Sequence, residues 1–165
     1  LYRTMEPNFT ELSVEHGSII ASRFADESVE ASQSVKVAKW SGSLYFANAA
    51  YFETKLLELI AKNNDELQYV IVDVASIVQV DASGEQVLSN LVESCSSSGV
   101  EILFARTERL EAELFRSGFK KRYGENRFFD LRADALKYVW QELENIEKEE
   151  DEAQVEDIDD ANESN

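Results

Sequence analysis

The fold is decided by residues 69–99, which read YVIVDVASIVQVDASGEQVLSNLVESCSSSG. The stretch opens with an apolar run, residues 69–74, that only Asp73 interrupts, and such a run is typical of a strand covered on both faces. Further on, apolar residues recur at helical spacing and form one stripe. Ser83 and Gln86 fit a capping box before that stripe, and Gly99 stands where a left-handed C-cap is expected. The stripe consists of Val87, Leu88, Leu91, Val92 and Cys95.

The same alternation of strand and helix continues on both sides of this stretch. We expect strands at residues 18–21, 35–40, 100–105 and 128–129. Helices are predicted from Asn48, as N-cap, to about residue 63, from Thr107 to Gly118, and from about Arg132 to about Ile146. Strands and helices that alternate through short connections are typical of a parallel sheet with crossover helices. The sequence therefore predicts one α/β domain with a mostly parallel sheet of about four to six strands.

Most of the negative charge lies at the C-terminal end of the chain. The formal net charge is −17, and residues 141–165 contain 12 acidic residues and one basic residue, so that segment alone carries −11. Few apolar residues accompany these charges, and burial cannot offset the entropy of ordering such a segment. We therefore interpret residues 147–165 as a disordered acidic tail. The acidic balance also argues against nucleic-acid binding, which needs a basic surface.

Several classes of protein find no support in the residues. Cys95 is the only cysteine and His16 the only histidine, so no internal disulfide, catalytic triad or imidazole metal cluster can be assembled. Cys95 is interpreted as a buried structural thiol. No apolar run approaches the roughly 20 residues that a membrane helix needs. Because the first residue is Leu1 and not methionine, we expect the chain to be a segment of a longer protein.

Two groups of residues are candidates for function. The first is the loop Asp81, Ala82, Ser83 and Gly84, where a helix N-terminus favours an anion or a partner, although Asp81 could equally serve only to cap the helix. The second is a basic cluster that could meet anionic lipid headgroups. A solvated face, or pairing with the acidic tail, explains the cluster as well. The cluster contains Arg116, Lys120, Lys121 and Arg122.

Three stretches, in this order and spacing, resemble the STAS domain (sulfate transporter and anti-sigma-factor antagonist) of sulfate-permease-type (SulP) anion transporters. They are LYFANA at residues 44–49, VDVASIVQVDASG at 72–84, and GVEILFA at 99–105 followed by LFRSGF at 114–119. A weaker match, LYRT at residues 1–4, resembles the linker that follows the last membrane helix. The resemblance covers about residues 35–143 well.

The resemblance implies a linker from a membrane region at residues 1–12 and a STAS domain at residues 13–146. It implies a cytosolic C-terminal domain that serves folding, assembly and control of an integral membrane transporter, and that needs no cofactor and is not an enzyme. The expected partners are the transmembrane domain of the same parent chain and a cytosolic regulatory protein. The loop Asp81–Gly84 would be the recognition surface, with weak nucleotide or anion binding there.

Two alternatives remain open at this stage. The first is a free-standing STAS regulator of the anti-sigma-factor antagonist type, which is switched by phosphorylation directly after the loop aspartate. Ala82 occupies that position and has no hydroxyl group, so that switch does not carry over to it. The second is a small α/β enzyme or nucleotide binder, against which stand the lack of a glycine-rich phosphate loop and of a catalytic set.

Overall fold

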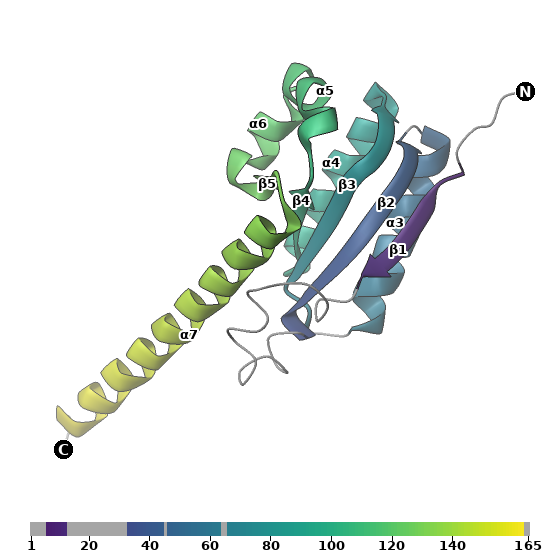
Figure 1. Cartoon of the computed structure of the whole chain (residues 1–165). Coiled ribbons are helices and arrows are strands. Elements are labelled where there is room, and N and C mark those ends of the chain that lie inside the picture. Colours follow the sequence, from purple (N-terminus) through teal and green to yellow (C-terminus); the bar gives the residue numbers. More distant parts are fainter. Residues whose placement is uncertain (1–5, 13–32, 45, 64–65, 164–165) are drawn as a thin grey trace, which may run out of the picture.

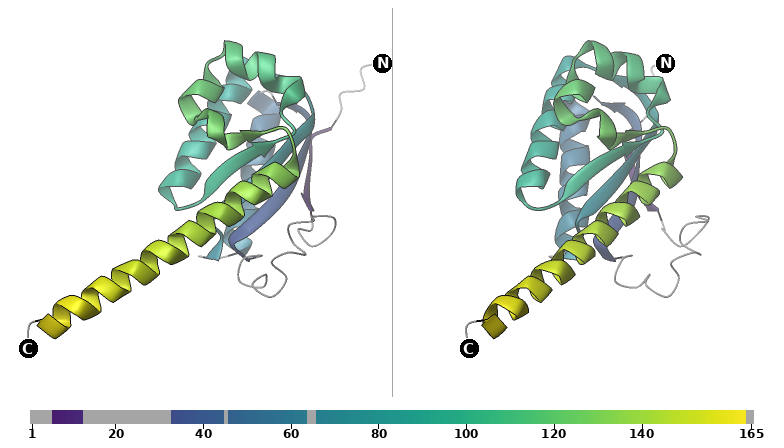
Figure 2. Two further views of the ribbon diagram at one scale, coloured as in Figure 1. Left: turned by 60° about the vertical axis from the view of Figure 1, so that its left-hand side comes forward. Right: turned by 90° about the vertical axis from the view of Figure 1, so that its left-hand side faces the viewer.

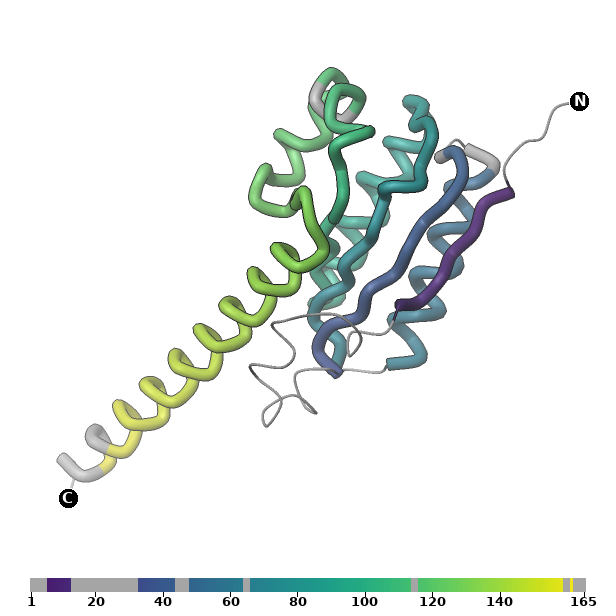
Figure 3. The backbone as a smooth tube through the Cα atoms, viewed as in Figure 1, coloured from purple at the N-terminus to yellow at the C-terminus, as the bar shows by residue number. Residues whose placement is uncertain are grey.

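The computed structural model describes residues 6–12, 33–44, 46–63 and 66–163, and within them lies one five-stranded sheet. The strands lie side by side in chain order (Figure 1 and Figure 3). β1 is antiparallel to β2, and the other neighbours are parallel. The predicted single α/β domain with a mostly parallel sheet is thus confirmed. The strands are β1 (Asn8–Leu12), β2 (Val35–Leu44), β3 (Tyr69–Val80), β4 (Glu101–Ala105) and β5 (Phe128–Phe129).

Helices cover both faces of the sheet. Since each crossover leads one strand further along the sheet and parallel crossovers are right-handed, α3 (Phe46–Lys62) and α4 (Ala82–Ser97) share one face. The long helix α7 (Arg132–Glu163) starts on the opposite face (Figure 1). Short elements join β4 to β5: η2 (Glu108–Leu110), α5 (Glu111–Arg116), α6 (Phe119–Tyr123) and η3 (Glu125–Arg127).

β3 is the middle strand and divides the core into two layers. Val70, Val72 and Val74 pack into the larger cluster with residues of α3 and α4. Tyr69 and Ile71 point the other way and pack against Leu136 and Val139 of α7. This alternation follows from the two-residue period of a strand. Because both faces of β3 are buried, the run that starts at residue 69 has no polar face.

The ends of the helices match the sequence prediction in one case and differ in another. Gly99 (φ 83°) ends α4 in a Schellman motif, because its N–H donates to Ser96 O at 3.0 Å and that of Val100 to Cys95 O at 2.9 Å. Asn48 is not the N-cap that we predicted. Helix α3 begins at Phe46, so Asn48 lies in its first turn and its side chain donates to Ser43 O.

The N-terminal segment also differs from the prediction. The chain from Asn8 to Leu12 was predicted as part of a linker, yet it forms β1 and pairs with β2 along Val37–Ser41. Pairing along an open sheet edge satisfies its backbone groups, a non-local interaction that composition does not reveal. The strand predicted at residues 18–21 falls outside the described residues.

The C-terminal segment differs from the predicted disordered tail as well. Helix α7 does not end near Ile146 but continues to Glu163, and Figure 2 shows it projecting beyond the sheet as a single helix. Residues 147–158 are all exposed. Strong helix formers such as Glu and Ala favour the helical backbone, although no burial supports it. No helix in the described part of the chain has the length and apolarity to cross a membrane.

We predict that removing the extension leaves the stability of the domain nearly unchanged. Truncation after Ile146 should shift the melting temperature by no more than about 2 °C, since exposed residues contribute little. The control is Leu136→Ala, which removes part of the buried packing between α7 and the sheet and should lower the free energy of unfolding by about 2–5 kcal/mol. Both are measured by thermal unfolding. A drop of several degrees on truncation would mean that the extension packs on the domain.

Candidate partner-binding site

The predicted loop, Asp81–Gly84, follows the carboxyl end of β3, and its first residue caps helix α4. The extended backbone of Asp81 (φ −96°, ψ 174°) places it at the N-cap of α4, and its Oδ1 accepts a hydrogen bond of 2.7 Å from the Gly84 N–H. This bond satisfies one of the N–H groups that a helix start leaves unpaired. The loop is also tied to α5, because Val80 N donates to Glu113 Oε2 at 3.2 Å.

The predicted capping box is wrong. Ser83 lies in the first turn of α4 and not at its N-cap, and the Gln86 side chain donates to Asn90 Oδ1 instead of reaching back. Asp81 and Ser83 are both good caps two residues apart, and Asp81 takes the position because the strand ends one residue before it. Ala82 and Ser83 are left exposed. A partner can therefore reach both side chains.

Part of the basic cluster is paired with carboxylates of the domain itself. Lys120 Nζ lies 2.9 Å from Glu111 Oε1, and Arg122 Nη2 lies 3.0 Å from Glu85 Oε1. Arg116 Nε donates to the carbonyl of Ala112. Lys121 is exposed. With two of its four cations paired to nearby carboxylates, the cluster offers a weaker field to anionic headgroups than the sequence suggests.

The pair Arg122–Glu85 brings the two candidate groups together, since Glu85 belongs to the first turn of α4. Beside this pair lies an open groove of about 450 Å³ between α4 and α6. Its rim carries two acids, Glu93 and Glu101, and two bases, Arg122 and Arg127. The groove lies beside the start of α4, and apolar residues such as Val92 and Phe119 line it together with these four residues, whose formal charges balance.

Tyr123 forms part of the groove wall and is fixed by hydrogen bonding. Its hydroxyl donates to the carbonyl of Ile102, and the Arg127 guanidinium lies 5.0 Å from its ring centroid. Burial raises the pKa of Tyr123 to about 12, although Arg127 works in the other direction. The phenol is therefore neutral at physiological pH, and its hydroxyl hydrogen is held by the carbonyl of Ile102.

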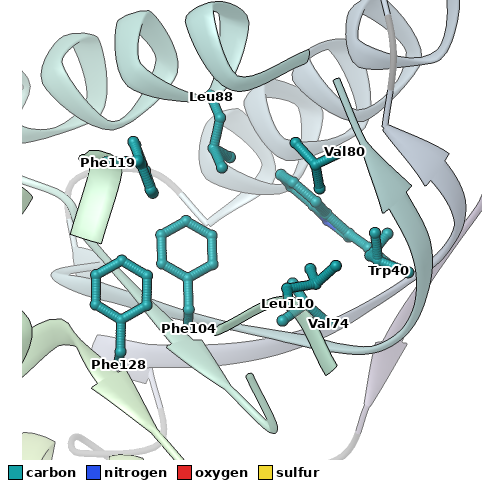
Figure 4. A pocket seen from close by; sticks show the side chains of 9 residues that line it. Trp40, Val74, Val80, Leu88, Phe104, Leu110, Phe119 and Phe128 are labelled. Carbon is teal, nitrogen blue, oxygen red and sulfur yellow. The ribbon is translucent and has the colours of Figure 1, made fainter. Parts of the chain in front are cut away.

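The core itself contains one small apolar cavity next to this region. Figure 4 shows its lining, in which Trp40, Leu88, Phe104 and Phe119 face one another. Its volume of about 10 Å³ only just reaches the space of a single water molecule. Trp40 Nε1 is buried and has no hydrogen-bond partner in the described part of the chain, while its ring stacks on Phe52. The cavity is too small for a substrate or cofactor.

Cys95 is buried, as predicted, on the apolar stripe of α4. Burial raises the pKa of its thiol to about 11, and the carboxylates of Glu53 and Glu101 add to this shift. The thiol is therefore protonated near neutral pH and a poor nucleophile. Within the described residues no group of His, Cys, Asp and Glu side chains could hold a metal ion, and His16 lies outside them.

Three charged residues that the sequence did not single out come together on the other face of the sheet. Asp73 on β3 is buried, and its Oδ2 lies 3.5 Å from Arg106 Nη1 and 3.3 Å from Arg132 Nε. Arg106 follows β4 directly, and Arg132 is the first residue of α7. The one signal in the sequence is that Asp73 interrupts an otherwise apolar strand, since a buried carboxylate requires a partner.

Comparison with known families identifies the domain. The sheet order and the two helical layers define an α/β domain with its loop at the carboxyl end of the middle strand. The family model described as "STAS domain" matches residues 28–135. That span covers more than half of the chain, and the chain belongs to the STAS domain family. A search of curated proteins finds no match.

Solved structures that share this fold include parts of transporters and a regulator. The chain is similar to a sulfate transporter family protein from Wolinella succinogenes, with 28% identity over 67% of this chain and 88% of that chain (TM-score 0.59). It is similar to the murine solute carrier 26 family member A9 anion transporter, with 19% identity over 84% of this chain and 23% of that chain (TM-score 0.66). An anti-sigma factor antagonist from Mycobacterium paratuberculosis matches at 16% identity over 80% of this chain and 94% of that chain (TM-score 0.54). The latter two likenesses show a shared fold alone.

We predict that substitutions at Asp81 will destabilise the domain more than a substitution at Ser83, because Asp81 and not Ser83 is the N-cap of α4. Asp81→Ala should lower the free energy of unfolding by about 1 kcal/mol, because the Gly84 N–H loses its acceptor. Asp81→Asn, which keeps an acceptor, is the matched control and should cost less. Ser83→Ala should change stability by no more than about 0.5 kcal/mol. Urea unfolding measures all three, and an equal loss from Ser83→Ala would contradict the assignment.

A second prediction concerns the reactivity of Cys95. With a pKa of about 11 the thiolate fraction at pH 8 is roughly one in a thousand, and burial blocks access as well. Ellman's reagent should therefore label the native domain very slowly at pH 8 and the denatured chain quickly. Rapid labelling of the native domain would show that the thiol is open to solvent.

Proposed function

We propose that this chain is the cytosolic C-terminal regulatory and assembly domain of a sulfate-type secondary anion transporter, and that it is not an enzyme. The observation that carries the proposal is the 28% identity to a sulfate transporter family protein over 88% of that chain. The protein then works at the cytoplasmic face of a membrane, joined to the transmembrane domain of the same parent chain. That transmembrane domain is its principal partner.

The geometry of the loop supports a binding role. Ala82 and Ser83 are exposed on a rigid base, because Asp81 caps α4, Val80 is bonded to α5 and Glu85 is paired with α6. Such a surface can recognise a partner with little loss of conformational entropy. The buried, protonated Cys95 and the hydrogen-bonded Tyr123 leave the surface without an activated nucleophile or base. We therefore assign the loop Asp81–Gly84 to partner contact and control of transport.

The alternative is a free-standing regulator of the anti-sigma-factor antagonist type. The fold shared with such an antagonist and the exposed hydroxyl group of Ser83 favour it. Ala82, at the position after the loop aspartate, speaks against it. The coding sequence upstream of Leu1 separates the two: about ten or more apolar spans support the transporter, and a start codon at Leu1 supports the regulator.

We predict that a charge placed on the loop impairs transport by the parent protein. Ala82→Glu adds a carboxylate beside Asp81 without removing the cap, and it should repel a partner surface selected for the neutral side chain. Sulfate uptake should fall several-fold at equal surface expression. Thr54→Glu, on the exposed side of α3, is the matched control and should leave uptake unchanged. Unchanged uptake with Ala82→Glu would remove the loop from the mechanism.

A further inference from the structure

The cluster around Asp73 carries more positive charge than the fold needs. The Asp73 side chain is 1% exposed, and its Oδ1 accepts a hydrogen bond of 3.0 Å from the Ala75 N–H. Its Oδ2 meets both Arg106 and Arg132. A buried carboxylate must be compensated, and one guanidinium is enough to balance its charge. The second arginine leaves the cluster with one excess positive charge.

Both arginines keep donors available for a ligand. Their side chains are 45% and 44% exposed, so the guanidinium groups reach from the buried carboxylate to solvent. Each contacts the same oxygen of Asp73 through one nitrogen, and a guanidinium has five N–H donors in a fixed fork. Both guanidinium groups therefore keep further N–H donors that are open to solvent.

The backbone holds Arg106 in an unusual conformation at this point. Its φ of 57° is the only positive φ of a non-glycine residue in the described part of the chain. The strained residue is held because its N–H donates to Phe129 O at 2.8 Å, which fixes it between the ends of β4 and β5. The cost of this conformation is explained if the position of the Arg106 side chain matters.

Charges of both signs surround the two arginines. Arg132 opens a helix of 32 residues, whose N-terminal end carries a partial positive charge. Lys39 pairs with Asp73 in the sheet register, so both side chains stand on the same face. Asp130 and Asp134 are exposed, and neither forms an ion pair with a described arginine. Arg106 directly follows β4 and Arg132 comes three residues after β5, and ligands of open α/β sheets bind beyond the carboxyl ends of such parallel strands.

We propose that Arg106 and Arg132, backed by Asp73, form a binding site for a tetrahedral oxyanion such as free sulfate or phosphate. Two guanidinium forks match the geometry of such an anion and can each donate two parallel hydrogen bonds to it. Asp73 orients both guanidinium groups, and its negative charge lowers the affinity of the site for an anion. The start of α4 is a poorer place for an anion, because the Asp81 carboxylate occupies its N-cap and Arg122 is already paired with Glu85. This inference does not depend on the proposed role in transport.

The test is a titration of the isotopically labelled chain 1–165 with sodium sulfate and, separately, with sodium phosphate. Ionic strength is kept constant with sodium chloride, and backbone amide shifts are followed by NMR. Saturable shifts are expected at Ala75, Arg106 and Arg132. Each of Arg106→Gln and Arg132→Gln should weaken binding by about tenfold or more, the effect of losing hydrogen bonds to a charged group. Lys62→Gln, which removes an exposed positive charge at the end of α3 on the other face of the sheet, is the matched control and should leave binding unchanged.

Asp73→Asn keeps the proposal falsifiable if an arginine variant fails to fold. The asparagine retains an acceptor for the Ala75 N–H and leaves both arginines without their internal counter-ion. Oxyanion binding should then become tighter than in the natural sequence, which a purely structural cluster does not predict. The proposal is overturned if neither the natural chain nor Asp73→Asn shows saturable shifts, or if Lys62→Gln weakens binding as much as the two arginine variants.

Discussion

The whole structure depends on β3 being buried on both faces. Val70, Ile71 and Val72 are completely buried, so neither side of this strand can face water. The crossover helices α3 and α4 cover one side, and α7 must return to cover the other. This requirement places the exposed loop at the carboxyl end of β3 and brings the start of α7 to Asp73. Both candidate sites are thus consequences of how one strand is covered.

The parts of the fold that depend on local pattern could be predicted from the sequence. The apolar stripe of α4, the left-handed Gly99 and the burial of Cys95 follow from spacing within a few residues. The N-cap could not be settled in this way, since Asp81 and Ser83 are chemically equivalent candidates and only the end of the strand decides between them.

Other features depend on contacts that are distant in the sequence. β1 exists because it pairs with an edge strand, and Asp73 and Arg106 meet although 33 positions separate them. Composition predicts that residues 147–165 cannot be buried, and residues 147–158 are indeed exposed. Composition does not determine whether an exposed segment is helical, and here α7 continues to Glu163.

The two surfaces of the domain suit different tasks. The loop at Asp81 is rigid, exposed and close to electrically balanced, which suits contact with a protein partner. The Asp73 cluster lies on the opposite face of the sheet and carries excess positive charge, which suits a small anion. A domain that binds a partner on one face and an anion on the other could relate anion concentration to the activity of an attached transporter, provided that the two sites are coupled.

The central claim is that the loop Asp81–Gly84 contacts the membrane domain of the same parent chain. The most direct measurement places a photo-crosslinking amino acid at position 83 of the full-length parent in native membranes and identifies the crosslinked peptides by mass spectrometry. If the loop makes this contact, crosslinks to cytoplasmic segments of the parent's own membrane domain are expected. Crosslinks only to a separate soluble protein would contradict it and assign the loop to a cytosolic partner instead.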